Sequence, residues 1–306
     1  MFRDELIDYT DWYLRAGHIS ESHGCRVEGD KHIKIRVSEC ERALFLAQSL
    51  YDVCHSLIDN EDFRVELYGV YFRGHVIHSV SGTIITLRQM NPKVMSLDEL
   101  GMPEKIKRKV LAKSPLKNGL LLVGGAQGQG KSTTVASILK ARLEAYGGHA
   151  LTVENPIEMP LDGWHSEGIC IQTQIDSHMS FADGVRGAMR SYPVGQQGIL
   201  MIGEIRDAET ATEACVAAVN GLLVIATIHA NNPLDIFYRM ESLAKSQISP
   251  DEARSLVSAG FRMLIHQEMF RGKVTMTTLN TSSSVVPHIK SGRYERLSTE
   301  LCSQNL

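Results

Sequence analysis

The chain has 306 residues, a formal net charge of −3, 43% hydrophobic residues and 22% charged residues. This is the composition of an ordinary globular protein, and the length predicts two domains. Acidic and basic residues are mixed along the chain, which argues against a surface for non-specific DNA or RNA binding. The N-terminus turns acidic at once and the longest apolar runs are strand-sized, so we expect no transmembrane segment and a cytoplasmic location.

Residues 1–95 carry both helix and strand signals and are predicted to form a small α+β domain. The expected elements, in chain order, are an amphipathic helix over 5–15, an alternating strand over 32–37, a helix over 40–57 and consecutive strands between 63 and 87. Residues 96–118, which include Pro103 and Pro115, are predicted to be a linker with a short helix.

Residues 119–306 follow a repeating pattern of short apolar strand, turn and helix. Strands are predicted over 120–123, 150–154, 198–203 and 222–227. Helices are expected after the Gly-rich loop, from Ser180 with its capping partner Asp183, over 207–220, and from Ser249. The alternation predicts a parallel sheet of the nucleotide-binding α/β class, with ligand at the carboxyl ends of the strands.

A glycine-rich loop lies between the first of these strands and the following helix. It reads Gly125-Ala126-Gln127-Gly128-Gln129-Gly130-Lys131-Ser132 and fits the P-loop pattern G-x-x-x-x-G-K-[ST]. Such a loop turns backbone N–H groups and a helix dipole toward phosphate. We expect Lys131 to neutralise the β- and γ-phosphates of ATP, the Ser132 hydroxyl to bind Mg²⁺, and Thr133 to contact the α-phosphate.

Phosphoryl transfer also needs a carboxylate near the metal and a group that orients water. Glu204 ends the buried strand over 198–203, where it could hold Mg²⁺ through water. Glu154 and Glu158 both leave the strand over 150–154, and physical reasoning alone does not choose between them. His229 ends the strand Leu222 to Ile228 and so points to the same sheet edge.

Four ordered segments resemble the type II/type IV secretion ATPases, and within them the PilT-like type IV pilus motors. They are the P-loop and the segments Thr152-Val153-Glu154-Asn155-Pro156-Ile157-Glu158, Ile199-Leu200-Met201-Ile202-Gly203-Glu204-Ile205-Arg206-Asp207 and Ala226-Thr227-Ile228-His229-Ala230-Asn231. In that family they are the Walker A, Asp box, Walker B and His box. The resemblance covers roughly residues 63 to 270.

The resemblance implies a RecA-like P-loop ATPase domain behind a PAS-like N-terminal domain, assembled as a hexamer. It implies that Glu158 activates the attacking water and that His229 senses or contacts the γ-phosphate. Arg73 and Arg88 match arginines that reach nucleotide between domains or subunits, and Arg190 matches a further family arginine. The implied partners are inner-membrane platform or secretion-complex proteins, which would place the chain at the membrane periphery.

The sequence also departs from the family pattern. Asn155 stands where aspartate is usual, Ser191-Tyr192-Pro193 replaces the usual acidic-Pro-Asp, and no Ala-Ile-Arg-Asn-Leu motif of retraction motors is found. We therefore expect a motor of a type IV pilus, type II secretion or conjugative type IV secretion machine, without assigning retraction. The alternatives are a slow nucleotide-gated regulatory switch and a RecA-like DNA translocase.

Overall fold

The computed structural model describes residues 2–28, 31–59, 62–90, 93–175, 178–193, 198–270 and 273–305. The chain divides into two compact units. Unit 1 contains Met1–Lys93, Asn155–Pro160 and Asp176–His178, and unit 2 contains Val94–Glu154, Leu161–Ile175 and Met179–Leu306. Among the described residues, none of the helices combines the length and the apolar character needed to cross a bilayer.

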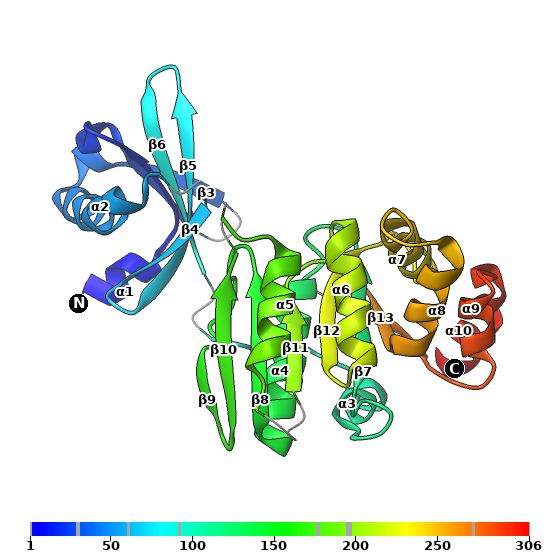
Figure 1. Ribbon diagram of the computed structural model, residues 1–306. Helices are drawn as coiled ribbons and strands as arrows, with labels where there is room; N and C mark the ends of the chain where they lie inside the picture. The colour runs from blue at the N-terminus through cyan, green and yellow to red at the C-terminus, as the bar shows by residue number, and fades with distance from the viewer. Residues whose placement is uncertain are drawn as a thin grey trace. The chain divides into compact units, whose positions relative to one another are not determined.

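Unit 1 is built on an antiparallel sheet of six strands in the order β3-β2-β1-β6-β5-β4 (Figure 1). The strands are β1 Tyr9–Arg15, β2 His23–Glu28, β3 Lys31–Arg36, β4 Asp62–Leu67, β5 Val70–Ser79 and β6 Gly82–Gln89. The helical segments are α1 Phe2–Ile7, η1 Ile19–Glu21, η2 Val37–Glu39, α2 Glu41–Cys54 and η3 His55–Leu57. Helix α2 places Ala43, Leu46 and Leu50 at helical spacing in one core with Trp12 and Phe72 of the sheet.

The predicted helix over 5–15 is wrong beyond its first turn, because α1 ends at Ile7 and β1 runs from Tyr9 to Arg15 between β2 and β6. A bulge interrupts the pairing with β2 between Tyr9 and Asp11. It places the buried residues Tyr9 and Trp12 three positions apart. A three-residue spacing is typical of a helix, so the bulge produced a helical pattern in a strand.

Unit 2 is built on a mixed sheet of eight strands in the order β14-β13-β7-β12-β11-β8-β10-β9. The strands are β7 Gly119–Gly125, β8 Gly148–Glu154, β9 Gly163–His165, β10 Gly168–Gln174, β11 Gly198–Ile202, β12 Leu223–His229, β13 Phe261–Phe270 and β14 Lys273–Asn280. The six strands from β13 to β10 pair in parallel, and β14 and β9 pair antiparallel at the two ends. The four predicted strands are confirmed as β7, β8, β11 and β12, and the other four were not predicted.

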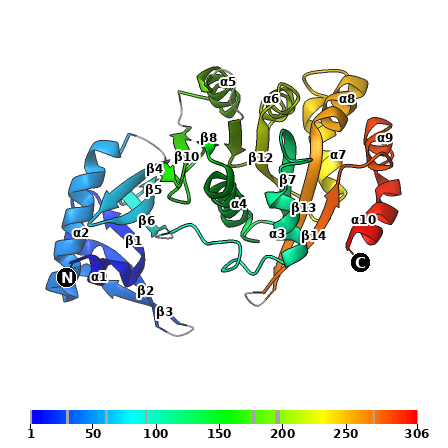
Figure 2. The same cartoon turned by 90° about the horizontal axis from the view of Figure 1, so that it is seen from below.

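Helices cover both faces of this sheet, with α4 on one face and α5 and α6 on the other (Figure 2). The helical segments are α3 Glu104–Leu111, α4 Lys131–Tyr146, α5 Phe181–Ser191, α6 Ala208–Val219, α7 Asp235–Ala244, α8 Pro250–Gly260, α9 Val285–Lys290, η4 Tyr294–Arg296 and α10 Leu297–Asn305. Strands buried on both faces read as continuous apolar runs, as β7 does. The α/β class with a parallel core is therefore confirmed.

Candidate nucleotide-binding site

The glycine-rich loop connects the carboxyl end of β7 to the start of α4, as predicted. Gly128 and Gly130 both have φ of +77°, a left-handed conformation that glycine adopts without steric cost. Gly130 is the residue preceding α4, and no side chain caps the helix there. The start of α4 thus offers backbone N–H groups and the positive end of the helix dipole to the loop. Both features suit a bound phosphate.

Lys131 lies inside this loop rather than in solvent. Its side chain is buried, with 8% of the residue exposed. The ammonium donates to the Ala126 carbonyl at 2.7 Å, and it lies 3.3 Å from Nδ1 of His229. The loop therefore surrounds one positive charge, at the position where a polyphosphate chain would bind.

His229 links Lys131 to Glu204. It is the last residue of β12, paired in register with Gly125 of β7, so the sheet places its ring beside the loop. Its Nε2 lies 2.9 Å from Oε1 of Glu204. A charged lysine only donates, so Nδ1 of His229 accepts from Lys131 and Nε2 carries the proton that is donated to Glu204. Lys131, His229 and Glu204 thus form a continuous hydrogen-bonded row.

Glu204 follows the end of β11 and is held on both sides by backbone bonds. The Gly203 N–H donates to the Val153 carbonyl at 2.8 Å, and the Ile205 N–H donates to the Thr227 carbonyl at 2.9 Å. These bonds continue the sheet pairing past the last assigned residue of β11. The carboxylate therefore leaves the sheet at a fixed position, the usual place for a Walker B acid.

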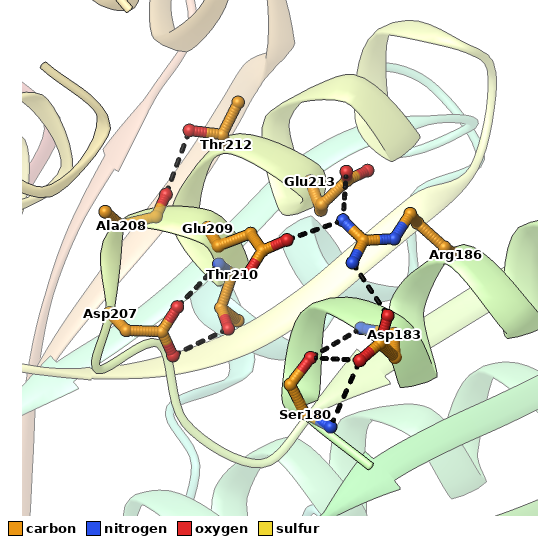
Figure 3. A network of polar contacts seen from close by, with 9 residues as sticks. All are labelled: Ser180, Asp183, Arg186, Asp207, Ala208, Glu209, Thr210, Thr212 and Glu213. Atoms are coloured by element: carbon orange, nitrogen blue, oxygen red, sulfur yellow. Dashed lines mark hydrogen bonds and ion pairs between the residues drawn. The ribbon is translucent and has the colours of Figure 1, made fainter. Parts of the chain in front are cut away.

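A network of polar side chains joins α5 and α6 beyond Glu204 (Figure 3). Arg186 of α5 donates to Asp183 at 2.8 Å, and to Glu209 and Glu213 of α6 at 2.9 Å each. The predicted capping box at Ser180 is confirmed, since Ser180 accepts from the Asp183 N–H. Hydrogen bonds from Ser180 and then from Arg186 lower the pKa of Asp183 to about 2. The network ties the helix that carries Arg190 to the helix that follows Glu204.

The two remaining candidate carboxylates have different surroundings. Glu154 ends β8, is buried with 4% of the residue exposed, and accepts at Oε1 from Thr152 at 2.6 Å and Gln172 at 2.8 Å. Glu158 belongs to unit 1, where its Oε1 lies 4.0 Å from Nη1 of Arg73. Unit 2 thus brings Lys131, His229 and Glu204 together, and the approach of Glu158 to the same nucleotide stays a prediction.

The candidate arginines lie on two surfaces. Arg73 of β5 and Arg88 of β6 are direct partners in the antiparallel register of unit 1. Arg88 donates from Nε to Asp11 at 2.8 Å, and this bond raises its pKa. Arg190 is exposed in the last turn of α5, and within the described parts of the chain it has no hydrogen bond or ion pair. All three arginines remain accessible, since the side chains of Arg73 and Arg88 are 44% and 76% exposed.

The sequence analysis missed a polar clamp on the glycine-rich loop from β13. Gln267 is fully buried; it donates to the Gln129 carbonyl and accepts at Oε1 from the Thr134 hydroxyl at 2.6 Å. The Met269 N–H donates to the Gln129 side chain. The available signal was a glutamine within the apolar run Phe261-Arg262-Met263-Leu264-Ile265-His266-Gln267. A buried amide must find partners, and here the loop supplies them.

Comparisons with known proteins bear on this site. The Type II/IV secretion system protein family matches residues 57–304. The uncharacterized protein YggR of Escherichia coli is 30% identical over 265 residues, covering 84% of this chain and 74% of YggR. The type IV pilus retractation ATPase PilT of Pseudomonas aeruginosa is 32% identical over 214 residues, covering 69% of this chain and 58% of PilT.

The fold comparison agrees with the sequence comparison. A crystal structure of the pilus retraction motor PilT with bound ADP superposes with a TM-score of 0.77 at 25% identity, covering 98% of this chain and 88% of that chain. The matching family model spans well over half of the present chain, and it includes the glycine-rich loop, Glu204 and His229. The chain is therefore a member of the type II/IV secretion system protein family, and one of its relatives is named a type IV pilus retractation ATPase.

Proposed function

We propose that the chain hydrolyses Mg-ATP and works as a hexameric motor of a type IV pilus, type II secretion or conjugative type IV secretion machine. The observation that carries the proposal is the hydrogen-bonded row of Lys131, His229 and Glu204 beside a glycine-rich loop. Family membership supports it, because the relative PilT is named a type IV pilus ATPase. The motor would act at the cytoplasmic side of the inner membrane through platform or secretion-complex proteins.

The roles proposed for the site follow from its charges. Lys131 binds the β- and γ-phosphates, and the Thr133 hydroxyl contacts the α-phosphate. The Ser132 hydroxyl and the Glu204 carboxylate are hard oxygen donors that suit Mg²⁺, which neutralises charge on the phosphates when bound. The Nδ1 lone pair of His229 points at Lys131. A γ-phosphate that binds the ammonium would therefore change the hydrogen bond from Lys131 to His229, and with it the hydrogen bond from His229 to Glu204.

Glu158 is proposed to orient the attacking water, and Glu154 to support the sheet edge. The hydrogen bonds from Thr152 and Gln172 to Glu154 favour that supporting part. The matched pair Glu158→Gln and Glu154→Gln tests the assignment. The first should lose steady-state phosphate release while it still binds a fluorescent ATP analogue, and the second should keep more of the activity. Hydrolysis at the wild-type rate by Glu158→Gln would contradict the role of Glu158.

Arg73, Arg88 and Arg190 are proposed to reach a nucleotide across a boundary between subunits or domains. Their exposure supports this role, because an arginine finger must reach a nucleotide that is bound to a different subunit or domain. Mixing inactive Arg88→Ala and Glu158→Ala subunits should restore part of the ATPase activity if Arg88 acts in trans. Absence of recovery at every mixing ratio would remove the in-trans role.

One pair of measurements separates the motor from a regulatory switch and from a DNA translocase. The ATPase rate is measured with and without DNA, and the native mass is measured on the same sample. A hexamer with DNA-independent turnover is expected. A slow monomer would establish the switch instead, and strong stimulation by DNA would establish the translocase.

A further inference from the structure

The stretch 105–117 breaks the even mixing of charges along the chain. It contains six cations, Lys105, Lys107, Arg108, Lys109, Lys113 and Lys117, and it contains no aspartate or glutamate. The rest of the chain is formally −9. This stretch begins in α3 and ends just before β7, within unit 2.

Most of these cations have no carboxylate partner. Lys107 pairs with Asp98 and Glu104, and Arg108 lies 4.0 Å from Glu104. Over the described ranges, Lys105, Lys109, Lys113 and Lys117 form no ion pair. Lys105 and Lys109 are four residues apart on α3, a spacing at which like charges repel. Burial lowers the pKa of Lys109, and the charge of Lys105 lowers it further.

Residues of the segment 112–117 line two hollows in the surface. A hollow of about 650 Å³ is lined by Lys105, Arg108 and Lys109 together with Pro115, Leu116 and Thr281. A second hollow of about 470 Å³ is lined by Lys113, Lys117, Arg142 and Tyr146. Both hollows are open to solvent, and volumes of this size occur in ligand-binding clefts. Cations thus line two open hollows.

Arg142 adds a buried positive charge to the second hollow. Only 5% of it is exposed, and its Nη atoms donate to the carbonyls of Val110, Ala112 and Leu116 at 2.6, 3.2 and 2.7 Å. The carbonyl oxygens accept from both Nη atoms but carry no negative charge that would compensate the guanidinium. Its Nε has no partner within the described residues. A negative group entering the hollow would compensate this charge.

Both hollows are far from the glycine-rich loop along the strands. The second is also lined by Gly148, Ile199 and Leu223, which stand at the amino ends of β8, β11 and β12. The loop follows the carboxyl end of β7, and α3 lies where β7 begins (Figure 1). A ligand at the hollows therefore leaves the nucleotide site open.

We infer that the surface formed by Lys105, Arg108, Lys109, Lys113, Lys117 and Arg142 binds an acidic segment of a partner protein. Carboxylate side chains on a flexible chain can enter both hollows and meet a cation in each. Arg142 is only 5% exposed, so a flat bilayer surface would meet the exposed lysines but not this charge, which a side chain on a flexible chain can approach. This inference rests on the proposed function, because a motor must bind the protein that it moves at a surface that stays accessible when nucleotide is bound.

The test measures binding without ATP. A fluorescein-labelled peptide of about ten glutamates is titrated with the full chain at about 0.15 M salt, and fluorescence anisotropy is read. The triple variants Lys105→Glu/Lys113→Glu/Lys117→Glu and Lys105→Gln/Lys113→Gln/Lys117→Gln should both bind at least about tenfold more weakly than the wild type. The glutamine variant keeps the test valid if charge reversal disturbs folding, which circular dichroism checks.

The matched control is Lys31→Glu/Lys245→Glu/Lys290→Glu, which changes three exposed lysines elsewhere and gives the same net charge. It should bind within about threefold of the wild type. An equal loss in this control would overturn the inference, because net charge alone would then drive binding. The same holds if the wild type does not bind the peptide, or prefers phosphatidylglycerol vesicles or single-stranded DNA to it. Lys131→Ala should bind the peptide normally, so failure of the ATPase proposal is distinguishable.

Discussion

Cations lie at both ends of the parallel strands of unit 2, which we call the carboxyl edge and the amino edge, and the partners of these cations differ. At the carboxyl edge, the Lys131 ammonium has the Ala126 carbonyl and the His229 ring within hydrogen-bond distance, and Glu204 follows at 2.9 Å from the ring. At the amino edge, Arg142 donates to backbone carbonyls and lies over the Tyr146 ring at 5.4 Å, and Lys113 lies over the same ring at 4.8 Å. At the carboxyl edge a carboxylate balances the positive charge, and at the amino edge the charge of Arg142 has no carboxylate partner among the described residues.

This difference separates two kinds of site. A closed row of donor and acceptor fixes the positions of side chains before a ligand arrives, as catalysis of phosphoryl transfer requires. An uncompensated cluster of cations stores repulsion that a ligand relieves, as binding of an acidic partner requires. Changes at one edge should therefore leave the property of the other edge intact.

The largest effect is expected from Lys131→Ala. It removes the only charge that the described part of the glycine-rich loop carries, so ATP hydrolysis should fall at least about a hundredfold, the usual cost of one preorganised donor. Phosphate release measures this loss. Lys140→Ala, a change further along α4, is the matched control and should keep activity. Full activity of Lys131→Ala would show that the side chains at the carboxyl edge do not take part in catalysis.

Gln267→Leu should have the next largest effect. It leaves the Gln129 carbonyl and the Thr134 hydroxyl without their buried partner, and each such loss costs about 1–3 kcal/mol of unfolding free energy. Urea unfolding measures the cost, and titration with a fluorescent ADP analogue should also show weaker binding.

Gln267→Glu sharpens the test of the clamp. It keeps an acceptor for Thr134, but it loses the donor to Gln129 and places a carboxylate at a fully buried position. If the clamp shapes the loop, nucleotide affinity should fall in both variants. Unchanged affinity in both would make Gln267 a residue of the core alone.

A smaller, pH-dependent effect is expected from Asp183→Asn. The pKa of Asp183 is about 2 in the folded chain, below its ordinary value of 3.8, so its stabilisation is present above about pH 4 and is lost as pH falls toward 2. The melting temperatures of the wild type and Asp183→Asn should differ at pH 7 and converge between pH 4 and pH 2. A constant difference over that range would contradict the assignment. Asp251→Asn, at the start of α8, is the control.

The smallest effect is expected from Lys105→Gln at the amino edge. Removing one of two like charges four residues apart should raise the unfolding free energy by roughly 0.2–0.5 kcal/mol. Chemical denaturation at low salt checks this, and the gain should shrink at about 1 M salt because the repulsion is screened. A loss of stability would show that Lys105 is engaged rather than repelled.

Local pattern determined much of this protein. The glycine-rich loop, its flanking strand and helix, the strands over 150–154, 198–203 and 222–227, and the start of α5 at Ser180 were all readable from sequence and are present in the structure. They were readable because strand periodicity, helix capping and turn chemistry depend on neighbours in the chain. The positions of Lys131, Glu204 and His229 at the carboxyl ends followed from the parallel alternation alone.

Tertiary structure decided what depends on residues distant in sequence. The bulge in β1 gives this strand a helical spacing of buried residues, and the segment is a strand because pairing with β2 and β6 outweighs local pattern. The clamp from Gln267 to Gln129 spans 138 positions, and the contact of Lys131 with His229 spans 98. Burial of Arg142 behind the stretch 105–117 is equally non-local. Such contacts form only when the sheet brings its strands together, and no window of sequence contains both partners.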